Sequence, residues 1–158
     1  MSSLEKVKAY FAAAGLADRV IVPEQSSATV EEAAAALGTE PGRIAKTLSF
    51  LVDGKPVLIL FAGDARVDNK KFRQRFHTKA RMIPGDQVES LIGHDIGGVC
   101  PFGTKPGIPV YLDESLKRFV TVFPAVGSGN SAIELNLDEL YAYSHALEWI
   151  DVCKLPEA

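Results

Sequence analysis

Hydrophobic residues dominate two consecutive runs, from residue 44 to 52 and from 55 to 62, and the runs meet at Asp53-Gly54. An Asp-Gly pair between two apolar runs is a strong signal for a two-residue turn, so the pattern predicts a β-hairpin. Because successive side chains of a strand point to opposite faces, the first run divides into two sets. We assign the core face to the set Ile44, Lys46, Leu48, Phe50 and Val52.

Lys46 places an ammonium group among the apolar side chains of this predicted core face. An unpaired ammonium is costly to bury, and lysines are rarely fully buried without a partner. Two interpretations remain open. Either the side chain extends past the sheet edge so that its head reaches water, or it lines a pocket that holds an anionic or polar ligand. Lys46 is therefore the residue for which the hydrophobic pattern most strongly indicates a functional site.

Helical periodicity and end signals predict helices on both sides of the hairpin. Ser2 with Glu5 and Thr29 with Glu32 have the spacing of a capping box. Gly38 is a C-terminal stop for the second of these helices. Asp68 and Asp138 are the expected N-caps of two later helices. The predicted helices cover residues 3–15, 30–38, 69–76, 86–92 and 139–147.

Short apolar runs predict further strands over residues 20–22, 80–83, 108–112, 119–126, 131–137 and 149–152. Short strands mixed with helices are typical of an α+β fold with a mixed sheet. A length of 158 residues fits one domain, which we place over residues 1–158.

Composition narrows the class of protein. Hydrophobic residues make up 47% and charged residues 23%, which is ordinary for a globular protein. The longest apolar run, residues 57–62, is far shorter than a membrane span, and residues 1–11 lack the apolar centre of a signal peptide. We therefore expect a cytoplasmic protein. The two cysteines and the widely spaced His77, His94 and His145 lack metal-ligand spacing, so neither a metal nor a cofactor is expected.

The stretch GGVCPFG, residues 97–103, predicts a rigid loop. Gly97 and Gly98 lack the Cβ atoms that would keep backbone N–H groups away from a ligand, and Pro101 stiffens the step that follows. Such a loop can form a concavity for an anion or a developing oxyanion. The alternative is an ordinary surface turn. A second glycine turn is expected at GSGN, residues 127–130.

Basic residues are concentrated between Arg66 and Arg81, where Asp68 is the only acidic residue, although the whole chain carries a formal net charge of −3. One interpretation is a solvated helix face, which is what charge runs usually are. The other is a surface that contacts phosphate groups. The residue pattern leaves both open.

Three motifs occur in a specific order: KTLSF at 46–50, GGVCPFG at 97–103 and GSGN at 127–130. In this order the chain resembles the YbaK/ProX family of aminoacyl-tRNA deacylases, which is related to the editing domain of bacterial prolyl-tRNA synthetases. The resemblance covers nearly the whole chain, from about Thr29 to Val152. Cys100 departs from the serine common in that loop, a difference that would tune the pocket without removing a nucleophile.

The resemblance implies a fold and an activity. It implies one compact domain with a barrel-like, mostly antiparallel mixed sheet surrounded by helices. It implies an enzyme that acts in trans on a mischarged tRNA and hydrolyses the ester of a small amino acid such as alanine or cysteine, with tRNA(Pro) as the expected carrier. An aminoacyl-tRNA synthetase is a further expected partner.

The resemblance also assigns site residues. It implies catalytic roles for Lys46, Gly97 and Gly98. It implies substrate-binding roles for Thr47, Val99, Cys100, Gly127, Ser128 and Gly129. The basic stretch would hold the tRNA through Lys70, Lys71, Arg73 and Arg75. Two other functions stay open: a tRNA-binding module of the same fold without turnover, and a pocket for a small anionic metabolite.

Overall fold

The hairpin at the centre of the sequence forms the centre of the fold. We analysed a computed structural model that describes residues 2–23, 29–95 and 97–156. Strands β2 (Ile44–Val52) and β3 (Lys55–Ala62) are antiparallel and pair over eight residue pairs. Asp53 and Gly54 join them with φ angles of 52° and 77°, as a two-residue turn of the favoured type requires. The predicted hairpin is confirmed.

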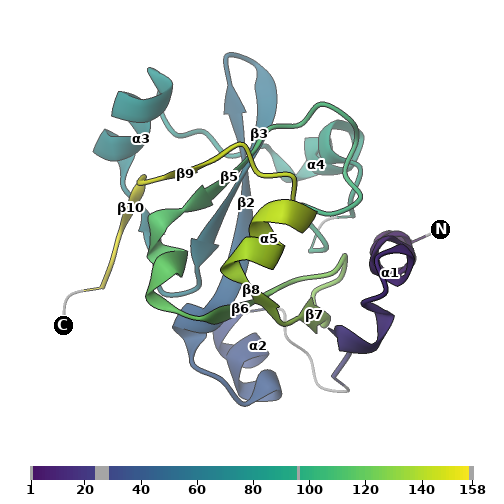
Figure 1. The fold of residues 1–158 in the computed structure, drawn as a ribbon. Coiled ribbons are helices and arrows are strands. Elements are labelled where there is room, and N and C mark those ends of the chain that lie inside the picture. Colours follow the sequence, from purple (N-terminus) through teal and green to yellow (C-terminus); the bar gives the residue numbers. More distant parts are fainter. Residues whose placement is uncertain (1, 24–28, 96, 157–158) are drawn as a thin grey trace.

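Four shorter strands complete the central sheet, in the order β8-β6-β2-β3-β5-β9 (Figure 1). Parallel pairs join β6 to β2, β5 to β3 and β9 to β5, whereas β8 is antiparallel to β6. The sheet is therefore mixed, and the long hairpin supplies most of its antiparallel pairing. The bounds are β5 (Val110–Asp113), β6 (Thr121–Pro124), β8 (Leu135–Asn136) and β9 (Glu148–Ile150).

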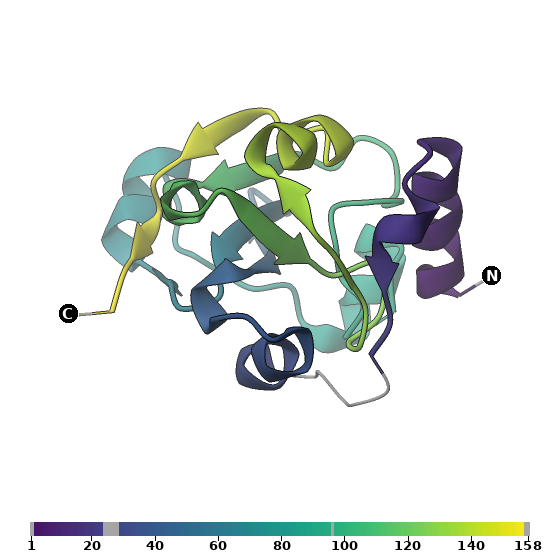
Figure 2. The same ribbon diagram turned by 60° about the horizontal axis from the view of Figure 1, so that its bottom comes forward.

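Two short ladders hold the ends of the chain against this sheet. Near the N-terminus, β1 (Val20–Ile21) pairs with β7 (Ala132–Ile133). Near the C-terminus, β10 (Cys153–Lys154) pairs with β4 (Arg66–Val67). The strands curl rather than lie flat (Figures 1 and 2), as the expected barrel-like sheet requires.

Five α-helices in the described part of the chain surround the sheet, and side-chain caps begin four of them. Figure 1 places α2 below the sheet, α3 at its upper left and α1 at the right. Ser2, Thr29 and Asp68 each accept a backbone N–H as predicted N-caps, and Gly38 ends α2 in the left-handed conformation. The bounds are α1 (Ser3–Ala13), α2 (Val30–Leu37), α3 (Asn69–Phe76), α4 (Gly85–Ile92) and α5 (Leu137–Tyr143). Single 3₁₀ turns lie at Ala17–Arg19, Pro41–Arg43 and Glu114–Arg118.

The predicted cap of the last helix is wrong. Asn136, not Asp138, begins α5, because the Asn136 side chain accepts the N–H of Glu139 at 2.8 Å. The Glu139 carboxylate accepts the N–H of Asn136 at 3.0 Å in return. This reciprocal pair satisfies two N–H groups at the helix start, whereas Asp138 lies inside the first turn.

Three predicted strands are shorter or divided. The stretch 131–137 separates into β7 and β8 on either side of Glu134. The stretch 119–126 forms a strand only over β6. The stretch 80–83 contributes an isolated bridge between Phe50 and Met82 rather than a strand.

The prediction of a single core face for β2 is also wrong. Phe50 and Ile44 are buried as expected, but Ala45 and Ser49 on the opposite face are equally buried. Ile44 packs with residues of α2, and Ala45 belongs to the main core. Both faces of this strand are covered, so burial does not follow the period-two alternation of a sheet with one solvated face.

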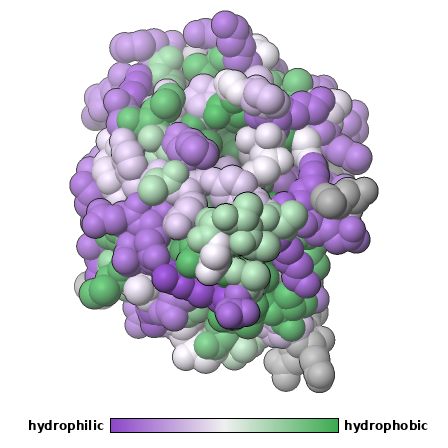
Figure 3. Space-filling view, turned by 45° about the vertical axis from the view of Figure 1, so that its right-hand side comes forward, coloured by the Kyte–Doolittle hydropathy of each residue, from purple (hydrophilic) through white to green (hydrophobic). Residues whose placement is uncertain are grey.

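The surface on the α1 side is partly apolar. Figure 3 shows green side chains gathered in the lower half of this face among hydrophilic neighbours. The exposed positions of α1 include Ala9, Ala12 and Ala13, whose side chains each present little apolar area. In the described residues, no helix combines the length and the apolar character needed to cross a membrane.

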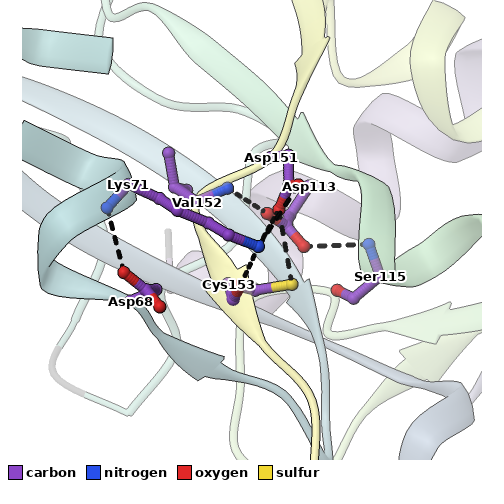
Figure 4. Close-up of polar contacts among 7 residues, drawn as sticks. All are labelled: Asp68, Lys71, Asp113, Ser115, Asp151, Val152 and Cys153. Carbon is purple, nitrogen blue, oxygen red and sulfur yellow. Dashed lines mark hydrogen bonds and ion pairs between the residues drawn. The ribbon is translucent and has the colours of Figure 1, made fainter. Parts of the chain in front are cut away.

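A buried carboxylate ties the C-terminal segment to the sheet (Figure 4). Asp113, at the end of β5, is fully buried and accepts the N–H of Ser115 at 2.8 Å and the N–H of Val152 at 2.9 Å. The N–H of Asp68 donates to the carbonyl of Val152. The start of α3 and the C-terminal segment are thus held together next to β4.

Replacing Asp113 by alanine leaves two buried N–H groups without an acceptor. We expect Asp113→Ala to lower the free energy of unfolding by about 3 kcal/mol, since each lost acceptor costs about 1–3 kcal/mol. The measurement is urea unfolding followed by circular dichroism. Asp138→Ala, at an exposed position, is the matched control and should cost less than about 1 kcal/mol. Equal losses in the two variants would contradict a locking role for Asp113.

Candidate active site

A cavity of about 210 Å³ lies where β6 separates from β2. The pairing of these strands covers only Ile44 with Phe123 and Ala45 with Pro124, after which the chain of β6 turns away. The apolar part of the wall includes Val30, Ala33, Leu37, Ile44, Phe123 and Ala132. The polar part includes Lys46, Thr47, Gly97, Ser128, Gly129 and Ser131. Five predicted site residues, from three separate stretches, therefore meet at one cavity.

The structure places Lys46 in the wall of a cavity. Its side chain is half-buried and lines the cavity, and its ammonium donates to the carbonyl of Ala65 at 2.5 Å and to that of Gly63 at 3.4 Å. Burial lowers the pKa of Lys46 below the ordinary value, and the nearby Asp64 partly opposes this effect. The charge is therefore paired with carbonyl dipoles while it remains beside the cavity.

The two glycine turns touch each other through backbone atoms. A Cβ atom on Gly98 would lie 2.3 Å from the carbonyl oxygen of Gly127, and one on Gly127 would lie 2.5 Å from the carbonyl oxygen of Ser3. Only glycine permits this approach at either position. The GGVCPFG loop, the GSGN turn and the start of α1 are thus in close backbone contact.

Gly97 and Gly98 differ in what they can offer a ligand. Gly97 is exposed, has a φ of 85°, and has open space around its Cα. Gly98 is buried, and its N–H donates to the carbonyl of Asp95 at 2.9 Å. The N–H groups of Gly97 and Val99 have no acceptor among the described residues. Gly97 therefore lines the cavity, whereas Gly98 provides close packing.

Ser131 organises the GSGN turn, and sequence reasoning missed it. Its hydroxyl lies 3.3 Å from the N–H groups of Val126 and Ser128 and accepts from both. The Ser128 hydroxyl lies 2.9 Å from Ser131 Oγ and 2.9 Å from Asn130 Oδ1. Serine hydroxyls commonly bond to nearby backbone groups in turns, so a serine directly after GSGN was an available signal.

Cys100 lies beneath the loop rather than in the cavity wall. It is fully buried, with Sγ 3.4 Å from the carbonyl of Phe102 and 3.5 Å from His94 Nε2. Burial raises the pKa of its thiol to about 12. Among the predicted substrate-binding residues, Val99, Cys100 and Gly127 shape the loops, whereas Thr47, Ser128 and Gly129 line the cavity.

The four basic residues predicted on α3 are not equivalent. Lys70 and Arg73 are exposed and have no acidic partner among the described residues. Lys71 donates to Asp151 and to the carbonyl of Cys153 (Figure 4), and Arg75 pairs with Glu148. In Figure 1, α3 lies at the end of the sheet away from α2, and α2 contributes Val30, Ala33 and Leu37 to the cavity wall. The free cations therefore lie on the outer face of α3, where Lys70, Arg73 and Lys79 border one groove.

The acidic groups in Figure 4 already have partners. Asp113, Asp151 and Cys153 lie close enough together to share a metal ion. However, Asp113 accepts two backbone N–H groups and Asp151 is paired with Lys71. This arrangement stabilises the C-terminal segment without an ion.

Comparison with known proteins identifies the family. The profile of the aminoacyl-tRNA editing domain matches residues 24–143. The chain belongs to this family. Membership of the aminoacyl-tRNA editing family confirms the resemblance to the YbaK/ProX deacylases and places the chain among aminoacyl-tRNA hydrolases.

The relatives include both proteins of similar length and much longer synthetases. The uncharacterised protein YwhH of Bacillus subtilis is 54% identical over 96% of this chain and 98% of its own length. EbsC of Enterococcus faecalis, named as a proposed Cys-tRNA(Pro)/Cys-tRNA(Cys) deacylase, is 33% identical over 68% of this chain and 66% of its own. A proline–tRNA ligase of Nitratidesulfovibrio vulgaris is 34% identical over 67% of this chain, which matches only 18% of that enzyme.

A solved structure shares the whole fold. It is described as a proposed trans-editing enzyme for prolyl tRNA synthetase, and it superposes with a TM-score of 0.85 at 31% identity. The match covers 100% of this chain and 99% of the other. The expected α+β editing-domain fold is thereby confirmed.

The burial of both cysteines predicts that neither thiol reacts in the folded protein. Burial raises the pKa of Cys100 and of Cys153 to about 12, so almost no thiolate is present at pH 8. We expect no reaction of the native protein with 5,5′-dithiobis(2-nitrobenzoate), and reaction of two thiols after unfolding in urea. Rapid release of one equivalent of chromophore from native protein would contradict the placement of Cys100 beneath the loop.

Proposed function

We propose that the chain is a trans-editing deacylase that hydrolyses the ester between a small amino acid and the 3′ end of a mischarged tRNA. Alanine and cysteine on tRNA(Pro) are the substrates we favour. The observation that carries the proposal is the cavity whose wall combines half-buried Lys46, exposed Gly97 and a set of apolar side chains. The names of EbsC and of the matched solved structure support a prolyl context.

The reaction needs only water and a site that stabilises charge. Water attacks the ester carbonyl, the bond to the ribose oxygen breaks, and the proton from water passes to that oxygen, with free amino acid and tRNA as products. The N–H of Gly97 would donate to the oxyanion of the tetrahedral intermediate, and one such donor is worth about 3 kcal/mol. The N–H of Gly98 is engaged by Asp95, so Gly98 acts by positioning the loop.

Lys46 would hold the 3′ end of the tRNA. Two of its ammonium directions are occupied by the carbonyls of Ala65 and Gly63, which leaves one N–H for a ribose hydroxyl or a phosphate. An ammonium fixed in this way supplies positioning, which lowers the entropic barrier of the reaction. The Ser128 hydroxyl, held by its own turn, would contact the same end of the substrate.

The dimensions of the cavity favour a small amino acid. Rejection of a smaller substrate by a synthetase is weak, because a missing methylene changes binding by only about 1–3 kcal/mol. A second site that admits only small side chains overcomes this limit. The apolar wall from α2 and β6, which includes Val30, Leu37 and Phe123, would provide that second sieve.

The tRNA body would contact the outer face of α3. Lys70 and Arg73 have no acidic partner among the described residues, whereas the ion pairs of Lys71 and Arg75 would have to break before either could bind phosphate. We therefore assign the first contacts to Lys70 and Arg73 and secondary roles to Lys71 and Arg75. Such a substrate implies a cytoplasmic location, and we propose an aminoacyl-tRNA synthetase as the source of the mischarged tRNA.

Replacing Lys46 tests the proposed reaction. We expect Lys46→Ala to lower kcat/KM for alanyl-tRNA(Pro) or cysteinyl-tRNA(Pro) by at least about 100-fold, because a fixed charge at the site is lost. The measurement is release of labelled amino acid from each mischarged tRNA, with prolyl-tRNA(Pro) as the cognate comparison. Lys55→Ala, at an exposed position of the same hairpin, is the matched control. No turnover by wild type on any of these substrates, with binding retained, would favour the tRNA-binding module.

Salt dependence of binding tests the assignment on α3. The double variant Lys70→Ala, Arg73→Ala should reduce the slope of log Kd against log salt by about 1–2, since each lost phosphate contact removes about 0.9. Filter binding of uncharged tRNA(Pro) at several salt concentrations provides the measurement. The double variant Lys8→Ala, Lys55→Ala alters two exposed lysines outside α3 and should leave the slope unchanged. An unchanged slope in the α3 variant would contradict phosphate binding and favour the interpretation of α3 as a solvated helix face.

A further inference from the structure

One edge of β2 is open in the middle of the sheet. In a two-residue hairpin the pair beside the turn is hydrogen-bonded, and bonded and non-bonded pairs then alternate along the ladder. Starting from Val52 and Lys55, the even-numbered residues of β2 bond to β3, so the odd-numbered residues direct their N–H and C=O groups to the other edge. The N–H of Leu51 donates to Arg81 at 2.8 Å, which agrees with this direction.

Different segments occupy the two ends of this edge. Near its start, Ala45 pairs with Pro124 of β6. Near its end, the carbonyl of Ser49 accepts the N–H of Ile83 at 3.1 Å. Thr47 lies between them, and its backbone N–H and C=O have no hydrogen-bond partner among the described residues.

The cavity occupies this gap. Thr47 lies in its wall, together with Ala125 and Ser128 of the segment that follows β6. The Thr47 hydroxyl is also buried without a partner, which is a second, independent sign of unmet hydrogen bonding at this residue. Thr47 is half-buried, and a polar backbone group that is shielded from water without a partner costs about 1–3 kcal/mol. An edge left open at a cavity therefore indicates a ligand that completes it.

We propose that Thr47 binds the aminoacyl group of the substrate through its main chain, as if that group were one residue of an added strand. This proposal rests on the proposed function and deepens it. The α-ammonium of the amino acid donates to the Thr47 carbonyl, and the Thr47 N–H donates to the ester carbonyl oxygen. Strand addition of this kind derives its affinity from main-chain groups and leaves the side chain to a separate pocket.

Two properties follow from this arrangement. The site recognises the α-ammonium that every aminoacyl ester carries, so recognition of the backbone and of the side chain are separate. Thr47 and Gly97 both line the same cavity, so the N–H groups of both would be available to the carbonyl oxygen. Thr47 then contributes to catalysis through a backbone N–H that no substitution other than proline removes.

Substrate analogues test the contact to the α-ammonium. Propionyl-tRNA(Pro) differs from alanyl-tRNA(Pro) only in lacking the amino group. We expect its enzymatic kcat/KM, divided by its spontaneous hydrolysis rate, to be at least tenfold below that of alanyl-tRNA(Pro). Equal normalised values would overturn the contact to the Thr47 carbonyl.

Hydrogen exchange tests the contact to the Thr47 N–H without requiring turnover. In the free protein the Thr47 amide should exchange at least tenfold faster than the amide of Leu48, which is bonded to β3. Saturation with 3′-alanylamino-3′-deoxyadenosine, an amide analogue of the substrate terminus, should slow exchange at Thr47 and leave Leu48 unchanged. Thr47→Val keeps the backbone and should retain this protection, and its loss in that variant would assign the contact to the hydroxyl and overturn the proposal.

The two proposals fail in different ways. If alanyl-tRNA(Pro) is hydrolysed but the analogue leaves exchange at Thr47 unchanged, the main-chain contact is wrong and the deacylase stands. If the analogue protects Thr47 but no aminoacyl-tRNA is hydrolysed, the contact stands and the proposed reaction is wrong.

Discussion

The continuous pairing of β2 with β3 is the interaction on which the rest of the structure depends. Eight residue pairs join these strands, and both faces of β2 are covered. The neighbouring strands are short and attach to the hairpin over only two or three residue pairs each. Because the hairpin supports the sheet by itself, β6 can leave β2 after two pairs. The cavity and the open edge at Thr47 are consequences of that early separation.

Close backbone contact sets the other side of the site. Gly98 packs on Gly127, and Gly127 packs on Ser3, at distances that exclude any side chain. These contacts bring loops 30 residues apart in the sequence to the same cavity and place the N–H of Gly97 at its border. Carbonyl groups of the segment after β3 hold the Lys46 ammonium on the facing wall. The C-terminal strand β10 pairs with β4, which directly follows Ala65. This pairing helps to fix the Ala65 carbonyl, which accepts the hydrogen bond from the Lys46 ammonium.

Local signals were sufficient for the elements and for the main site candidates. Asp53-Gly54 predicted the hairpin, and Ser2, Thr29 and Asp68 predicted three helix starts, because turns and caps depend on residues within one or two turns of the chain. Asn136 was missed because Asn136 and Asp138, two positions apart, both suit a cap, and only the reciprocal bond with Glu139 decides between them. The core face of β2 was misassigned because the alternation rule assumes one solvated face, whereas both faces are covered: Ile44 packs with residues of α2 and Ala45 belongs to the main core.

The sequence by itself determined which chemical groups are available: a lysine in an apolar strand, two glycine turns, a basic helix and a family-specific order of motifs. These follow from residue type and spacing, which a linear chain carries completely. Only the tertiary structure decided how the groups are used. It showed that Cys100 is packed beneath its loop, that the N–H of Gly98 is already engaged, and that Lys71 and Arg75 are paired with Asp151 and Glu148. The partners of Lys71 and Arg75 lie 80 and 73 residues away in the chain, and no local pattern contains them.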